Sequence, residues 1–372
     1  MLSVRLLILV LFSLIYNQFV MAQTPMIRAN SKTVSIKDGE EFKKDYWTIN
    51  PKIKKDTYYS SNIGSKVTFY TDVDSISATV NPNQPFVFSI FLENKKALTE
   101  VAYFPSYREI LKKAAAYNFN DNRELPLFNY QSAENKHLKQ LRLKYNIDSI
   151  AGTGDEISKI LNVLEWIHKK ISHDGQHANP KAKNADEMIS VCSTEQRGLN
   201  CRGLAITLNE CYLSLGFRSR YVTCWPKDSL NIDRDVHVIN SVFVNSLNKW
   251  IWIDPTNNAY VMNDKNDILS IEEVRESIIL NKPLKINKEA NYNQVKPVSI
   301  DSYLYHYMAK NLYILECPLS SEFNYESRSL LKVMSHKFKF LRLLPIDSQN
   351  QKEHRFWGFY KTNNPNVFWA KP

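Results

Sequence analysis

The sequence predicts an α+β protein in which a cysteine-bearing helix packs on an antiparallel sheet. This core is expected to lie between an N-terminal β-rich domain and a C-terminal extension of helices and strands. Three observations support this prediction: apolar residues recur at helical spacing over 204–215, residues 236–254 have the pattern of a β-hairpin, and short alternating runs fill residues 66–104. With 372 residues, of which 44% are hydrophobic, the chain can form two or three domains.

The N-terminus has the pattern of a secretory signal peptide over residues 1–22. Arg5 precedes an apolar run at 6–15, and Val20-Met21-Ala22 offers a cleavage site before Gln23. We therefore expect cleavage after Ala22 and a secreted or periplasmic bacterial protein. The apolar run is short and is soon interrupted by polar residues, so we expect no membrane span after cleavage. An uncleaved anchor is the alternative.

Residues 23–125 predict an N-terminal β-rich domain. Alternating runs at 66–73, 75–80, 85–92 and 99–104 indicate strands, and Asn81-Pro82-Asn83 is typical of a turn between two of them. This pattern favours a small β-sandwich or barrel. A helix is expected over 108–117, followed by a linker at 119–127.

Residues 126–265 predict the domain that carries the chemistry. Cys201 comes just before a helix that Gly216 is expected to end, so its thiol lies in or just before the first turn. The unpaired amides and the dipole of a helix start favour an anion and lower the pKa of a thiol. Gly203 leaves room for the close approach of another chain segment or a substrate.

The hairpin that follows predicts a partner for this thiol. Residues 236–244 alternate, Asn245-Ser246-Leu247-Asn248 forms the turn, and 249–254 returns. If Asn245 opposes Asn248, then Ile239 opposes Asp254, and His237 is the diagonal neighbour of Asp254 on the same face. Diagonal neighbours lie close enough for a hydrogen bond between their side chains.

Cys201, His237 and Asp254 are therefore the candidate catalytic residues. A thiolate can act as nucleophile, and an imidazole held by a carboxylate can act as its base. Each residue alone has an ordinary structural explanation, as a buried thiol, a structural histidine or a turn aspartate. The helix start and the hairpin register together favour catalysis. Cys192 is the rival nucleophile, but it lacks such a helix start behind it.

The same segments resemble a known family. Asn200-Cys201-Arg202-Gly203-Leu204-Ala205, His237 on a strand, and Trp252-Ile253-Asp254-Pro255-Thr256 look like the transglutaminase-like superfamily, as do helices expected at 157–171 and 184–189. The resemblance covers about residues 155–262. It implies a papain-like fold and acyl transfer through a thioester. This chain has His237-Val238-Ile239-Asn240 where many members have His-Ala-Trp, which concerns the substrate groove more than the triad.

Residues 266–372 predict a C-terminal helix-plus-strand region. Ser270 with Glu273 is a capping box that begins a helix to about Leu280, and a second helix is expected over 301–312. Aromatic-rich strands are expected over 331–344 and 354–369.

The number of cysteines limits the possible disulfides. The chain has five cysteines, so at least one is free or joined to another chain; if that one is Cys201, the other four could form two disulfides.

The charge of the chain indicates which ligands it favours. The net charge of +10 falls to +9 without Arg5 and favours anionic envelope polymers. No basic module with stacking aromatics predicts nucleic-acid binding. His168, His173 and His177 match no metal-ligand spacing, so we expect neither metal nor cofactor.

Three functions are compatible with this sequence. The first is an exported cysteine amidase or peptidase that acts on a peptide or protein amide, including a cell-envelope polymer. The second is a protein-crosslinking transglutaminase, with an amine in place of water. The third is a non-catalytic module that binds a glycan or protein. The Cys201 backbone N–H is expected to supply one oxyanion donor, and the second is not identified: Trp166 and Gln196 are candidates, although packing and surface roles suit them better. The oligomeric state is open.

Overall fold

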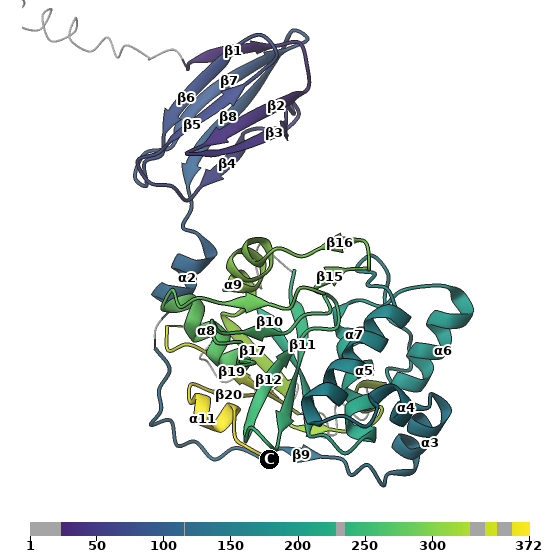
Figure 1. Cartoon of the computed structure of the whole chain (residues 1–372). Coiled ribbons are helices and arrows are strands. Elements are labelled where there is room, and N and C mark those ends of the chain that lie inside the picture. Colours follow the sequence, from purple (N-terminus) through teal and green to yellow (C-terminus); the bar gives the residue numbers. More distant parts are fainter. Residues whose placement is uncertain (1–23, 115, 228–234, 328–338, 348–358) are drawn as a thin grey trace, which may run out of the picture. The chain divides into compact units, whose positions relative to one another are not determined.

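A computed structural model (Figure 1) describes residues 24–114, 116–227, 235–327, 339–347 and 359–372. The chain divides into two compact units, Met1–Ser106 and Tyr107–Pro372. The sequence-based boundaries after residues 125 and 265 differ from this division, since residues 107–125 and 266–372 belong to the second unit. The signal peptide expected at 1–22 lies outside the described residues. No helix among the described residues has the length and apolar character needed to span a bilayer.

The first unit consists of two four-stranded sheets that share one buried core (Figure 1). The strand orders are β1-β7-β8-β4 and β3-β2-β5-β6. Of the two predicted alternatives, the structure therefore has the sandwich. The strands are β1 (Met26–Ala29), β2 (Thr33–Asp38), β3 (Glu41–Thr48), β4 (Asp56–Ser60), β5 (Lys66–Tyr70), β6 (Ser75–Thr79), β7 (Phe86–Leu92) and β8 (Lys95–Tyr103).

The second unit is built on a six-stranded sheet with the order β12-β11-β10-β17-β19-β20. All neighbouring strands are antiparallel except β19 and β20. The predicted hairpin is confirmed with its register, because Val244 pairs with Lys249 and Asn240 with Ile253. The strands are β10 (Ser219–Trp225), β11 (His237–Val244), β12 (Lys249–Ile253), β17 (Ile314–Pro318), β19 (Phe340–Leu343) and β20 (Phe359–Thr362).

Helices of the first half of this unit cover one face of the sheet (Figure 1). The central helix, α7 (Cys201–Ser214), is buried on all sides from Gly203 onward, as expected of a helix enclosed by other elements. Gly216 follows it with a φ of 86°, which suits glycine and confirms the predicted helix end. Around it pack α3 (Lys136–Lys144), α4 (Ile147–Ala151), α5 (Glu156–Lys170) and α6 (Ala185–Glu195).

Elements from the C-terminal part and α2 (Tyr107–Lys113) form the core on the opposite face. The predicted capping box is confirmed, with Ser270 and Glu273 bonded reciprocally at the start of α8 (Ile271–Ile279). The helix predicted over 301–312 is present, but Asp301–Met308 (η1) is wound as a π-helix before a short α-helix, α9 (Ala309–Asn311). Small two-stranded pairs complete the unit: β9 (Asn129–Tyr130) with β18 (Ser320–Ser321), β13 (Val261–Met262) with β14 (Lys285–Ile286), and β15 (Asn291–Tyr292) with β16 (Lys296–Pro297).

The strand predicted over 354–369 is wrong in its second half. Among the described residues of this range, only β20 is extended, and Pro365–Phe368 forms a short helix, α11. Asn364 caps this helix by accepting from the Asn366 N–H, and Pro365 occupies its first turn, where a missing N–H costs nothing. The aromatic composition favours a strand here, but the helix-start signal of Asn364-Pro365 agrees with the structure. Residues 348–358, and 328–338 in the other predicted strand, lie outside the described residues.

Candidate active site

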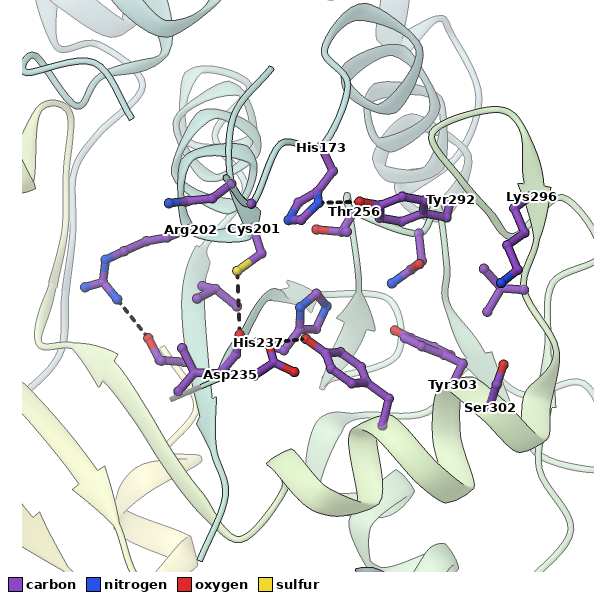
Figure 2. Close-up of a pocket in the computed structure, with 18 of the residues that line it drawn as sticks. His173, Cys201, Arg202, Asp235, His237, Thr256, Tyr292, Lys296, Ser302 and Tyr303 are labelled. Carbon is purple, nitrogen blue, oxygen red and sulfur yellow. Dashed lines mark hydrogen bonds between the residues drawn. The ribbon is translucent and has the colours of Figure 1, made fainter. Parts of the chain in front are cut away.

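A cavity of about 590 Å³ opens where the start of α7 meets the start of β11 (Figure 2). Cys201 and His237 line it, and Asp254 lies directly behind His237. The opposite wall comes from the β15–β16 hairpin and from η1, which contribute Tyr292, Lys296, Ser302, Tyr303 and Tyr307. The cavity therefore joins segments that are about 100 residues apart in sequence.

Cys201 is the first residue of α7, as the sequence predicts. Asn200 caps the helix, and its Oδ1 accepts from the Gly203 N–H over 3.1 Å. Asn179 holds this cap by donating to Asn200 Oδ1 over 2.7 Å and accepting from the Asn200 N–H over 3.1 Å. A Cβ on Gly203 would lie 2.6 Å from the Asn179 Oδ1, so the glycine admits this second segment of the chain.

His237 and Asp254 form the hydrogen bond that the hairpin register predicts. His237 Nε2 and Asp254 Oδ2 are 2.8 Å apart, and both side chains are almost fully buried. Because Nε2 faces the carboxylate, Nδ1 is the ring nitrogen left for the Cys201 sulfur. Figure 2 shows the His237 ring directed toward Cys201.

Asp254 is held by donors on both carboxylate oxygens. Oδ1 accepts from the Thr256 N–H over 2.9 Å. Oδ2 accepts from Asn257 Nδ2 over 3.0 Å and from the Tyr303 hydroxyl over 2.6 Å, in addition to His237. Burial raises the pKa of a carboxyl, but His237 and these donors outweigh it and hold the Asp254 pKa below its usual range. Asp254 is therefore a fixed negative charge behind the imidazole.

The pKa values of the thiol and the imidazole favour an ion pair. Burial raises the Cys201 pKa, yet hydrogen bonds from His173 and His237, the charge of His237 and the Val238 N–H together lower it to about 6. Burial lowers the His237 pKa, yet Asp254 raises it to about 10. At neutral pH the arrangement therefore favours a thiolate beside an imidazolium, which is the reactive form of a cysteine nucleophile.

The remaining thiols are in a different chemical state. All five cysteines are free, and burial raises the pKa of Cys192, Cys211, Cys224 and Cys317. The two possible disulfides are thus not formed in this structure. Cys192, the rival nucleophile, lies in α6 away from the cavity lining.

Arg202 follows Cys201 in the first turn of α7, and its guanidinium is held by Glu326 and Thr223. It forms an ion pair with Glu326 and donates to the Thr223 hydroxyl over 3.0 Å. The Glu326 carboxylate also accepts from the Tyr221 hydroxyl over 2.6 Å. This partly buried network attaches the helix start to β10 and to the chain before β19, which limits movement of Cys201.

Residues 144–255 match the family model of the transglutaminase-like superfamily. The chain contains a transglutaminase-like domain. The matched residues begin at the end of α3 and end just after Asp254, so they include Cys201 and His237. The wall formed by residues 292–307 lies beyond this domain match. A search among curated proteins finds no match.

Three solved structures are similar to parts of the chain. A Cytophaga hutchinsonii protein described provisionally as a cysteine protease is 22% identical, with a TM-score of 0.26, over 35% of this chain and 40% of its own. A Parabacteroides distasonis protein described provisionally as a protease is 15% identical, with a TM-score of 0.21, over 45% and 30%. Red sea bream transglutaminase is 9% identical, with a TM-score of 0.25, over 82% and 70%. The chain thus spans less than half of the first two proteins.

Within the transglutaminase-like domain, the three predicted site residues come together, whereas Trp166 and Gln196 do not line the cavity. Trp166 packs against Tyr145, and Gln196 is an exposed residue after α6. Sequence reasoning considered His173 only as a metal ligand, and it overlooked the tyrosines at 292, 303 and 307. Among the described residues, no three His, Cys, Asp or Glu side chains converge as metal ligands.

Proposed function

We propose that this protein is an exported cysteine-dependent hydrolase of peptide or amide bonds. One observation carries the proposal: Cys201 opens a helix in a cavity where it faces His237, whose second nitrogen is bonded to the buried Asp254. Nucleophile, base and orienting carboxylate are the parts that covalent acyl transfer requires.

The reaction follows from these positions. The Cys201 thiolate attacks the carbonyl carbon, and the carbonyl π electrons move to the oxygen. As the C–N bond breaks, the leaving amine takes the proton from His237 Nδ1, which leaves a thioester on Cys201. Water then attacks the thioester and gives a proton to His237, and the C–S bond breaks to release a free acid and restore the thiolate–imidazolium pair.

A purely structural role accounts poorly for this site. Removing an imidazole and a carboxylate from water is expensive, and apolar residues of similar size are often as stable in such positions. Both His237 and Asp254 are nevertheless buried, with five donor groups on one carboxylate. A catalytic role explains why the histidine and the carboxylate are buried together, whereas a binding scaffold does not require them.

The positive charge of Lys296 favours hydrolysis over crosslinking. Arg202 and Asp235 also line the cavity, but they are paired with Glu326 and Lys310. Lys296 lines the cavity and is exposed to solvent. Its ammonium repels the protonated lysine that a crosslinking enzyme must admit as acceptor, whereas water is unaffected. The same charge, with the net charge of +9 that remains without Arg5, favours anionic substrates. We therefore propose acidic peptides of a cell-envelope polymer as the substrate class, reached by export through the signal peptide at 1–22.

The test uses residues 23–372 as the purified mature protein. Two substrates are compared: peptides released from cell-wall polymer, and the protein casein. Mass spectrometry follows new free carboxyl groups, in the presence and absence of a labelled primary amine at millimolar concentration. We expect hydrolysis that is absent in Cys201→Ala and retained in the matched control Cys192→Ala.

Two outcomes would replace the proposal. If amine incorporation exceeds hydrolysis, the protein is a crosslinking transglutaminase. If neither reaction occurs and Cys201 is no more reactive toward iodoacetamide than the buried thiols, the domain is a non-catalytic binding module.

A further inference from the structure

His173 lies beside Cys201 because of a specific backbone contact. It follows α5 in a segment that forms a parallel bridge with the residues before Cys201: Asp174 N–H donates to Leu199 C=O over 2.8 Å, and Leu199 N–H to Ser172 C=O over 3.1 Å. Gly198 permits this approach, since a Cβ there would lie 2.5 Å from the Ser172 oxygen. The position of His173 is thus fixed to the chain that carries Cys201.

The β15–β16 hairpin holds His173 from the other side. Asn293 Oδ1 accepts from the His173 N–H over 2.6 Å, and Asn293 Nδ2 donates to the His173 C=O over 3.0 Å. The neighbouring Tyr292 hydroxyl lies 2.9 Å from His173 Nδ1, and the two rings meet at 61°. Both the backbone and the ring of His173 are therefore held by the β15–β16 hairpin.

These contacts decide which ring nitrogen faces the sulfur. Nδ1 is engaged by Tyr292, so Nε2 is the nitrogen directed at Cys201 (Figure 2). A thiolate can only accept hydrogen bonds, so a partner of the thiolate must carry its hydrogen on Nε2. Nδ1 is then the acceptor, and the Tyr292 hydroxyl donates to it. The Tyr292 hydroxyl, which can donate as well as accept, is thereby a suitable partner for this tautomer and holds the ring in place.

His173 and His237 are not equivalent. His237 is bonded to a carboxylate, which stabilises the imidazolium and raises the His237 pKa despite burial, and this suits a residue that gives a proton to the leaving group. His173 is bonded to a neutral hydroxyl. An imidazole N–H that a hydroxyl holds beside the nucleophile is suited to donate a hydrogen bond to a developing oxyanion.

We propose that His173 Nε2–H is the second oxyanion donor, paired with the backbone N–H of Cys201, and that Tyr292 orients it. This inference rests on the proposed acyl-transfer function. When Cys201 attacks, the carbonyl oxygen becomes an anion next to the sulfur, where the first-turn amide of α7 and the His173 ring both lie. Both donors are present before the substrate binds, which is the arrangement that stabilises a tetrahedral intermediate most effectively.

Two reactions of the same thiolate separate this role from a general effect on Cys201. Acylation by p-nitrophenyl acetate passes through an oxyanion, whereas alkylation by iodoacetamide is a direct displacement that forms none. Each rate is measured against pH, and the plateaus at which Cys201 is fully ionised are compared. Asn and Gln form a matched pair of replacements, because the Gln amide nitrogen reaches about as far as Nε2 and the Asn nitrogen only as far as Nδ1.

We expect His173→Asn to lower the acylation plateau about 100- to 1,000-fold, the usual effect of losing one oxyanion donor. The alkylation plateau should stay unchanged, which also shows that the site is folded. His173→Gln should recover most of the acylation rate, and Tyr292→Phe should lower acylation selectively but less.

The outcomes distinguish the two proposals. If both pH profiles of His173→Asn shift equally and both plateaus are retained, His173 only tunes the thiolate and the oxyanion role is wrong. The same conclusion follows if Asn and Gln have equal effects. If the wild-type protein is alkylated at Cys201 but never acylated, the acyl-transfer function itself fails.

Discussion

The Tyr303 hydroxyl donates to Asp254 Oδ2 over 2.6 Å, on the same oxygen that faces His237 Nε2. Trp252 Nε1 in turn donates to the Tyr303 oxygen over 3.2 Å. A chain of hydrogen bonds thus runs from β12 through η1 to the candidate base. Tyr303 lies beyond the residues that match the transglutaminase-like family, so the C-terminal part of the chain contributes directly to the geometry of the site.

Replacing Tyr303 with Phe tests this contribution. The change removes one donor to a buried carboxylate and leaves the Trp252 N–H without its acceptor. An unsatisfied buried polar group costs about 1–3 kcal/mol, so the free energy of unfolding should fall by that amount in urea titration. The kcat of hydrolysis should fall more than KM rises, because the Asp254–His237 pair is less well oriented. Equal activity would show that the other donors suffice.

Asp254→Asn should have a much larger effect on turnover than on folding. The amide can leave His237 in the wrong tautomer, which costs about 10⁴ in kcat in the comparable serine enzymes. The Cys201 thiol should also become harder to ionise, because His237 loses the charge that raises its pKa. The readout is kcat together with the pH at which iodoacetamide alkylation is half-maximal, which should move upward. If turnover is lost but the pH of half-maximal alkylation is unchanged, Asp254 acts only in the proton-transfer steps and does not help to ionise Cys201.

The pH dependence follows from the two shifted groups. Below about 6 the Cys201 thiolate is protonated, so alkylation and hydrolysis both decline. Above about 10 His237 loses its proton, so hydrolysis declines for lack of a proton donor while alkylation persists. Hydrolysis should therefore be bell-shaped and alkylation should rise to a plateau, with apparent values that belong to the coupled pair. A fall in alkylation at high pH would argue against this assignment.

The same shifts have opposite signs for stability. Folding lowers the Cys201 pKa, so its contribution to stability is lost as pH falls through about 6. Folding raises the His237 pKa, so its contribution is complete below about 6.5 and lost as pH rises through about 10. Thermal unfolding of Cys201→Ala should therefore lack the Cys201-dependent fall in stability between about pH 9 and pH 6, and this variant serves as the control.

Gly203→Ala should lower the reactivity of Cys201 indirectly, through the cap of α7. The new methyl would overlap Asn179, which holds the Asn200 cap of α7. Such overpacking typically costs about 1–3 kcal/mol, and we expect that loss in urea titration together with slower alkylation of Cys201. Asn179→Ala isolates the loss of the hydrogen bonds from the steric clash. If the two variants behave alike, the cap rather than the clash is responsible; a neutral Gly203→Ala would contradict the close approach.

The part of the site that sequence predicted depends on local patterns. A two-residue period, a turn and one register assignment place His237 beside Asp254, and a helical period places Cys201 at the start of α7. His173 and Tyr303 have no such signal, since each reaches the site through contacts about 26 to 50 residues away along the chain: His173 through the bridge before Cys201, and Tyr303 through its bond to Asp254. Pairing of distant segments is decided by tertiary packing, which the period of a single segment does not encode.

The same distinction explains the errors and successes in the fold. The capping box at Ser270 and the helix end at Gly216 are each determined by a few adjacent residues, and both predictions are confirmed. The π-helical winding of η1 has no comparable signal in adjacent residues, and Tyr303 and Leu304 within it are buried in the core. In α11 the local helix-start signal of Asn364-Pro365 agrees with the structure, whereas the aromatic composition of this segment does not indicate its conformation.

The strand order has a consequence for any attempt to isolate the transglutaminase-like segment. β10 lies in the middle of the sheet, with β11 on one side and β17, from about 90 residues later, on the other. A fragment ending near residue 265 would keep the cysteine, the histidine and the aspartate but leave β10 with a row of unpaired backbone groups. Exposed edges of this kind recruit strands from other molecules. Such a truncation would therefore be prone to aggregate, and inactivity in it would say nothing about the chemistry of the intact chain.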